Sequence, residues 1–155
     1  MIFNSQAKEL FGEPDIFAFE ENSEYPISRK YDRFGRDYYS VSHFWNMDEN
    51  ISEETDLSIM EWDGNDIHLS FTEKGALGSE FNRAIGIVKS WKKQLEKYSD
   101  SKFYIIMSYD NGDLLDEEDR EYSFTLRFWK ERSGSSLITP SVNEFEQPVI
   151  IEQCN

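Results

Sequence analysis

The chain of 155 residues is poor in the residue types that build most catalytic and metal sites. It has only two histidines, His43 and His68, and one cysteine, so the sets of cysteines and histidines that hold zinc are missing. Both histidines fall at alternating positions of predicted strands, with no glycine-rich turn beside them to present a nucleophile. Neither a GxGxxG nor a GxxxxGK(S/T) string occurs, which gives no support to nucleotide-dependent chemistry. We therefore expect a protein that is not an enzyme and that binds neither a cofactor nor a metal.

Paired cysteines and long hydrophobic runs are also missing. A lone cysteine, Cys154, suits a reducing compartment, because small secreted domains usually carry an even set, and we expect it in a C-terminal tail. No stretch approaches the roughly 20 apolar residues of a membrane span. Residues 1–9 have neither the basic start nor the apolar run of a signal peptide. The sequence thus predicts a cytoplasmic protein that does not contact a membrane.

Basic residues are scarce in relation to acidic ones. Sixteen Lys and Arg stand against thirty-one Asp and Glu, which gives a net charge of −15. A charge of this size repels nucleic acid and attracts basic proteins, and binding a phosphate backbone needs clusters of Lys and Arg. We therefore expect a basic protein as the partner and no direct contact with nucleic acid. The plainer interpretation of the charge is solubility.

Aromatic residues, in contrast, are abundant, and they predict a packed fold. Twelve Phe, eight Tyr and four Trp exceed what disordered chains carry, and the length suits one domain over residues 1–155. Residues 1–37 are the least regular part: a short helix capped by Asn4 or Ser5 and ending at Gly12, then a short strand over residues 15–19. Residues 24–36 interleave basic and aromatic side chains. We expect these basic residues to pair with nearby acids, not with nucleic acid.

The rest of the chain predicts an α+β fold. Strands are expected over residues 38–45, 102–109, 121–130 and 148–151, the last at an edge because Pro148 cannot donate to a ladder. Asp-Gly-Asn at 63–65 predicts a tight hairpin between strands 56–62 and 66–72. Apolar residues spaced by three and four predict one long amphipathic helix over about 79–98, with Trp91 in the core and Lys92 and Lys93 exposed. Its Gly86 would allow a close helix–sheet approach. An antiparallel sheet of five or six strands with this helix on one face fits the order best.

A dense acidic loop follows the strand over residues 102–109. Seven acidic residues and one arginine lie between Asp110 and Glu121. An EF-hand calcium loop needs oxygen ligands at its third and fifth positions, which here are Gly112 and Leu114, so that pattern fails. Three interpretations remain open: a solvated hairpin tip, an irregular calcium site, and a surface that docks a basic protein.

With its small size, acidic charge, α+β order and acidic loop, the chain resembles the immunity proteins of bacterial toxin systems, including those of contact-dependent growth inhibition. The resemblance implies a bacterial, cytoplasmic inhibitor that neutralises a cognate toxin domain, frequently a basic nuclease. It rests on the profile of the chain and transfers no residue roles.

From the residues themselves we predict partner binding through an acidic surface with aromatic anchors, because interface energy concentrates in a few Tyr, Trp and Arg side chains. The alternatives are a nucleic-acid mimic that acts on a nucleic-acid-binding protein, and a structural or adaptor subunit. The oligomeric state stays open. The predicted partner-binding residues are Asp110, Asp113, Asp116, Glu117, Glu118, Asp119, Tyr38, Tyr39, Trp45, Arg127 and Trp129.

Overall fold

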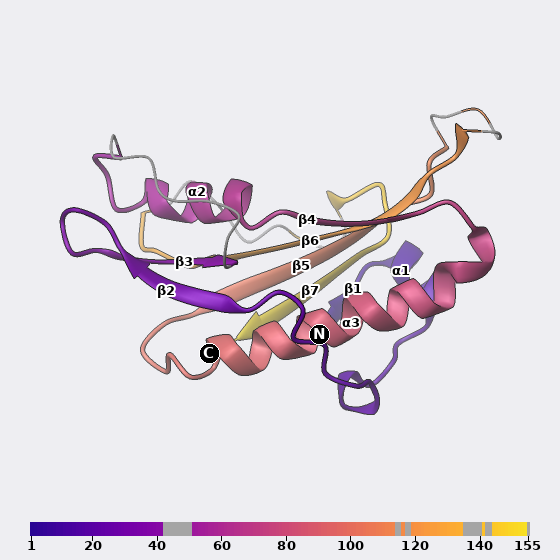
Figure 1. Cartoon of the computed structure of the whole chain (residues 1–155), viewed down its shortest axis with the longest axis horizontal. Coiled ribbons are helices and arrows are strands. Elements are labelled where there is room, and N and C mark those ends of the chain that lie inside the picture. Colours follow the sequence, from indigo (N-terminus) through magenta and orange to yellow (C-terminus); the bar gives the residue numbers. More distant parts are fainter. Residues whose placement is uncertain (42–50, 114–115, 117–118, 135–140, 142–143, 155) are drawn as a thin grey trace.

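A computed structural model describes residues 1–41, 51–113, 116, 119–134, 141 and 144–154, and it confirms the α+β class (Figure 1). A five-stranded antiparallel sheet has the order β1-β7-β5-β6-β4, and β2 and β3 form a second, two-stranded sheet. No helix in the described part of the chain is long and apolar enough to cross a membrane. The elements are β1 (Ile2–Phe3), α1 (Ser5–Phe11), the 3-10 helix η1 (Ile16–Ala18), β2 (Ile27–Tyr31), β3 (Asp37–Val41), α2 (Asp56–Gly64), β4 (Ile67–Phe71), the 3-10 helix η2 (Lys74–Ala76), α3 (Leu77–Leu95), β5 (Phe103–Asp110), β6 (Tyr122–Lys130) and β7 (Val149–Cys154).

Strand β5 is central, as its apolar residues on both faces predict. It pairs with β6 on one side and β7 on the other. The expectation of an edge position for the last strand is wrong, because β7 lies between β5 and β1. Pro148 precedes the strand, so its missing N–H costs no ladder bond, and its carbonyl accepts a hydrogen bond from the Tyr109 N–H at 3.0 Å. Cys154 is likewise not in a tail: it lies in β7 and is buried in the core.

Helix α3 covers one face of the large sheet (Figure 1). Its apolar stripe packs on the alternating residues of β5, β6 and β4, and the side chain of Trp91 is 0% exposed. The other face of the sheet has a smaller apolar cluster, in which Trp62 of α2 packs edge-on against Trp129. The core of the protein therefore lies mainly between the sheet and α3.

The outer face of α3 is crossed by residues 15–27, which we call the strap. Gly86 allows a close approach of the strap to α3, and not of the helix to the sheet as expected. A Cβ on Gly86 would lie 2.7 Å from the carbonyl oxygen of Glu20. The Trp91 indole N–H donates to the Tyr25 carbonyl at 2.8 Å, and Lys89 donates to the Phe19 carbonyl at 2.6 Å. Polar groups on the helix thus hold the strap in place, which the sequence alone did not indicate.

Two predicted elements of the N-terminal half are wrong. The hairpin expected at residues 56–72 keeps only its second strand, β4, because residues 56–64 form helix α2. Gly and Asn suit a helix C-terminus as well as a hairpin turn, and Asn65 caps α2 here. Residues 15–19 contain η1 and no strand, since the Asp15 carboxylate accepts the Phe17 N–H at 2.9 Å. The first helix is confirmed as α1, capped by Asn4 and ended at Gly12.

Helix α2 is fixed by a buried ion pair. Both oxygens of the Glu61 carboxylate accept from the Arg132 guanidinium, at 2.9 Å each. The backbone N–H groups of Tyr39 and Lys130 donate to the same carboxylate at 2.9 and 2.7 Å. Burial raises the pKa of Glu61, and Arg132 and the two N–H donors oppose this rise. The pair joins α2 to β3 and β6, so the small sheet is held against the large one.

Candidate binding groove at the acidic hairpin

Residues 110–121, which we call the acidic hairpin, connect β5 to β6. The described carboxylates of Asp110, Asp113, Asp116 and Asp119 belong to exposed residues. The base of the hairpin is ordered by local bonds: Asp110 accepts the Gly112 N–H at 2.8 Å, and Asn111 accepts the Asp113 N–H at 3.1 Å. Asp110 therefore shapes the turn. The Asp113 carboxylate also accepts from the Asn111 side-chain amide at 2.6 Å, and like those of Asp116 and Asp119 it belongs to an exposed residue.

The turn needs glycine at position 112. Gly112 has a φ of 68°, and a Cβ there would lie 2.4 Å from the carbonyl oxygen of Glu121. Residues with side chains rarely adopt this backbone conformation. The close approach of the two strands at the hairpin base thus depends on this residue.

A groove of about 490 Å³ lies beside the acidic hairpin. Its lining combines apolar residues, which we call the floor, with charged groups, which we call the rim: the carboxylates of Asp110, Asp113 and Glu146 and the cations of Lys74 and Arg120. Four segments that are far apart in the sequence bring these residues together. The apolar part of the lining is Leu10, Leu77, Tyr109, Tyr122 and Pro148.

The Tyr109 hydroxyl lines this groove and is affected by burial and by nearby acidic groups. Burial raises the pKa of its hydroxyl, and the charges of Tyr122, Asp110 and Asp113 raise it further. A negative charge on this hydroxyl is therefore disfavoured. We call this cavity the hairpin groove and take it as the candidate binding site.

Other predicted partner-binding residues lie elsewhere. Tyr38, Tyr39 and Trp129 are buried, so their rings contribute to packing and are not presented to a partner. Arg127 donates to Asp66 at 2.6 Å and lies 5.0 Å from the Trp62 ring centroid, on the sheet face opposite α3. Trp45, Glu117 and Glu118 lie outside the described residues.

The sheet face that carries Arg127 has a smaller pocket of about 200 Å³. In it, Thr125 Oγ1 lies 3.0 Å from His68 Nδ1, and His68 Nε2 lies 3.3 Å from the Asp66 carboxylate. Thr125 is paired within the sheet on both sides, with His68 and Ser108. The Asp66 carboxylate is shared with Arg127. The arrangement is that of a surface network between neighbouring strands.

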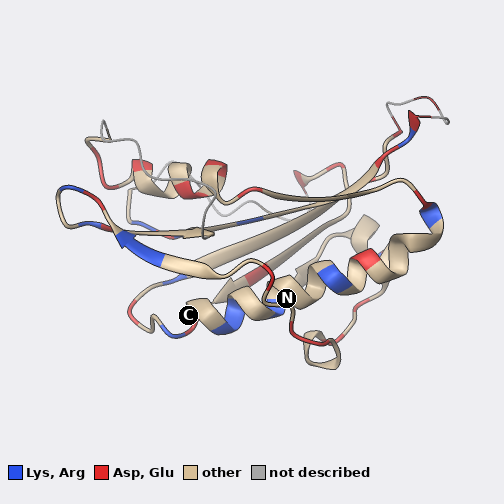
Figure 2. Ribbon diagram, viewed as in Figure 1, with Lys and Arg blue, Asp and Glu red and all other residues tan. Residues whose placement is uncertain are grey.

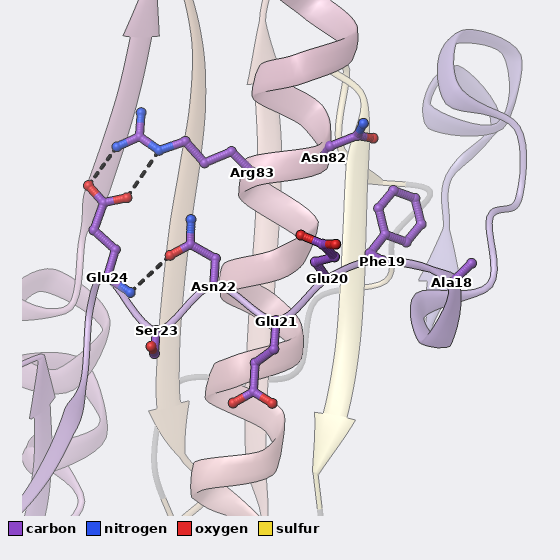
Figure 3. A pocket seen from close by; sticks show the side chains of 9 residues that line it. All are labelled: Ala18, Phe19, Glu20, Glu21, Asn22, Ser23, Glu24, Asn82 and Arg83. Carbon is purple, nitrogen blue, oxygen red and sulfur yellow. Dashed lines mark hydrogen bonds and ion pairs between the residues drawn. The ribbon is translucent and has the colours of Figure 1, made fainter.

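A cavity of about 800 Å³ lies where the strap crosses α3 (Figure 3). The cation in its lining is Arg83, whose guanidinium already donates to both oxygens of Glu24, at 2.6 and 3.1 Å. The hydrogen bond from Arg83 lowers the pKa of Glu24 more than burial raises it, so the pKa is lowered overall. Because Glu20 and Glu21 also line the cavity, it repels anions. We therefore see a structural junction here.

Sequence reasoning located the acidic hairpin but missed the groove beside it. The sequence gives little indication of this groove, because Leu10, Leu77 and Pro148 approach one another only through the tertiary fold. Within the described residues, no group of three or more His, Cys, Asp or Glu side chains is placed to hold a metal ion. Comparison of the chain with protein-family models, with curated proteins and with solved structures finds no match.

Proposed function

We propose that this protein is a non-catalytic inhibitor of the immunity type, which binds and neutralises a basic toxin domain, a nuclease in the first instance. The observation that carries the proposal is the hairpin groove beside the exposed acidic hairpin: an apolar floor and a rim of three carboxylates and two cations, on a chain with a net charge of −15. Basic domains that bind nucleic acid present Lys and Arg side chains, whose aliphatic stems bury well on apolar surface while their charges meet carboxylates.

The two parts of this surface have different physical roles. Exposed carboxylates on the acidic hairpin act at a distance and raise the rate of encounter with a basic surface. The apolar floor acts after contact and slows dissociation, because buried apolar area provides most of the energy that holds an interface. An inhibitor that must reach its toxin before damage occurs benefits from both.

The test uses the protein encoded by the gene next to that of this chain, produced as an isolated domain. We expect co-expression of this chain to remove the toxicity of that domain, and surface plasmon resonance to show rapid association that slows with added salt. Asp113→Asn, Asp116→Asn and Asp119→Asn, combined in one variant, should lower the association rate by about tenfold or more at low salt. Growth that stays inhibited, with no complex formed, would refute the proposal.

Two further variants separate the roles of rim and floor. Leu10→Asp puts a charge into the apolar floor, so we expect faster dissociation with a nearly unchanged association rate. Lys93→Gln is the matched control, because this lysine is 67% exposed and pairs with Glu21 on the strap, away from the groove. Lys92 is unsuitable, contrary to the expectation from sequence, since it forms an ion pair with the buried Glu152.

Binding to nucleic acid distinguishes the proposal from a direct nucleic-acid binder. The net charge of −15 repels a phosphate backbone, so we expect no complex with duplex DNA or RNA at moderate salt. Cytochrome c, an unrelated basic protein, serves as the specificity control. Equal affinity for cytochrome c and for the neighbouring gene product would show charge attraction without specificity and would contradict the proposal.

A further inference from the structure

A basic, aromatic hairpin projects from the acidic protein at the end farthest from the acidic hairpin (Figure 2). Residues 29–36, which we call the prong, form the end of β2 and its connection to β3, and they carry four basic residues against one acid. Tyr31 and Phe34 are 60% and 59% exposed on it. The prediction that these basic residues pair with acids is confirmed for Arg29, which binds Asp37, and for Arg36, which binds Asp32.

The tip of the prong is held in one shape. The Asp32 carboxylate accepts the N–H groups of Phe34 and Arg36 at 2.8 and 2.9 Å, and Gly35 adopts a φ of 77°. The guanidinium carbons of Arg33 and Arg36 lie 4.7 and 4.9 Å from the centroid of the Phe34 ring. Arg36 is anchored in addition by the carbonyl oxygens of Ile51 and Ser52. An exposed ring in contact with two cations is therefore presented with little entropy left to lose on binding.

Such a ring needs a partner surface that is apolar in the middle and acidic at the rim. Single-stranded nucleic acid also stacks on exposed rings, but every phosphate of its backbone is repelled by the net charge of −15, and it offers no apolar cavity that would enclose Phe34. The hairpin groove offers both parts of this chemistry: Tyr109, Tyr122 and Leu77 on the floor, and three carboxylates on the rim, which outnumber the cations of Lys74 and Arg120 there. Its volume of about 490 Å³ leaves room for a phenyl ring and the stem of an arginine.

We propose that the partner of the prong is the hairpin groove of a second copy of this chain. The prong and the acidic hairpin lie at opposite ends of the longest axis of the molecule (Figure 1). Two copies packed side by side in antiparallel orientation place each prong on the groove of the other, so a twofold pair closes with two identical contacts. At physiological salt the Debye length is about 8 Å, which screens the repulsion between two acidic chains more than it weakens the direct contacts.

Sedimentation velocity of the purified chain tests this inference, at about 0.15 M salt and over concentrations from about 10 to 500 µM. We expect a concentration-dependent monomer–dimer equilibrium. Arg33→Asp on the prong and Glu146→Arg on the groove should each weaken the dimer by about tenfold or more, because each change affects both contacts. Mixed in equal amounts, the two variants should dimerise like the wild type, since each contact then joins opposite charges again.

Phe34→Ala should also weaken the dimer, whereas Phe17→Ala is the matched control: Phe17 is 76% exposed, lies on η1 away from both surfaces, and should leave the dimer unchanged. A wild-type chain that is monomeric at every concentration would overturn the inference. So would a dimer that is indifferent to Arg33→Asp, or a mixture of the charge-reversed variants that fails to associate. The assay contains no other protein, so its outcome is separate from that of the toxin-binding experiment.

Discussion

The buried ion pair of α2 yields the sharpest stability prediction. Arg132→Met keeps an unbranched side chain of similar length but leaves the Glu61 carboxylate, 0% exposed, without its counter-ion. Breaking a buried pair in this way costs about 3–5 kcal/mol, because the remaining charge stays desolvated. The free energy of unfolding of such domains is about 5–15 kcal/mol, so the variant should lose a large share of its stability. Urea denaturation at neutral pH, followed by tryptophan fluorescence, measures the difference.

A second variant separates charge from hydrogen bonding. In Arg132→Met combined with Glu61→Leu no charge remains, but the N–H groups of Tyr39 and Lys130 lose their acceptor. Each unpaired buried donor costs about 1–3 kcal/mol, so the double variant should recover only part of the loss. If Arg132→Met lowers the free energy of unfolding by less than about 1 kcal/mol, Glu61 is not buried as described. Helix α2 would then give way to the hairpin that the sequence favours.

Three further predictions concern the core, the hairpin base and acid stability. Trp91→Ala should cost about 3–5 kcal/mol in urea denaturation, and a loss below about 1 kcal/mol would show that α3 does not bury this ring. Gly112→Ala should be more destabilising than Gly35→Ala, because both have positive φ but only Gly112 faces a backbone oxygen at 2.4 Å; equal melting temperatures would contradict this. Burial raises the pKa of Asp37, but hydrogen bonds from Lys130, Tyr39 and Arg29 outweigh it, so the pKa is lowered overall. Its stabilisation is therefore full above about pH 4 and is lost as pH falls through the folded pKa, and Asp37→Asn should flatten the acid side of the stability profile.

The large sheet and α3 were predictable because their signals are local and repeated. Alternation over residues 121–130 and the stripe of three and four around Trp91 extend over many residues, so tertiary context could not override them. The 56–64 segment carries no such repeat. Its helix depends on Glu61 meeting Arg132, two residues 71 positions apart, and no local pattern reveals that contact.

The candidate site was predictable only in part for the same reason. Acid density marked residues 110–121, whereas the groove floor is assembled from α1, η2–α3 and the β7 approach. Aromatic anchors were expected at Tyr39 and Trp129, but both rings are buried in packing contacts. Tyr39 lies edge-on to Phe103, and Trp129 stacks on Tyr104. A strand pattern shows which face a ring is on, and it does not show what covers that face.

The central claim, that the acidic hairpin docks a basic toxin domain, is tested most directly by one rate. It is the association rate constant between the combined Asp113→Asn, Asp116→Asn and Asp119→Asn variant and the domain encoded by the neighbouring gene. Surface plasmon resonance at low salt measures it. The account predicts a rate about tenfold or more below that of the wild type, with a difference that shrinks as salt is added. A neutralised hairpin that associates as fast as the wild type at low salt would contradict it.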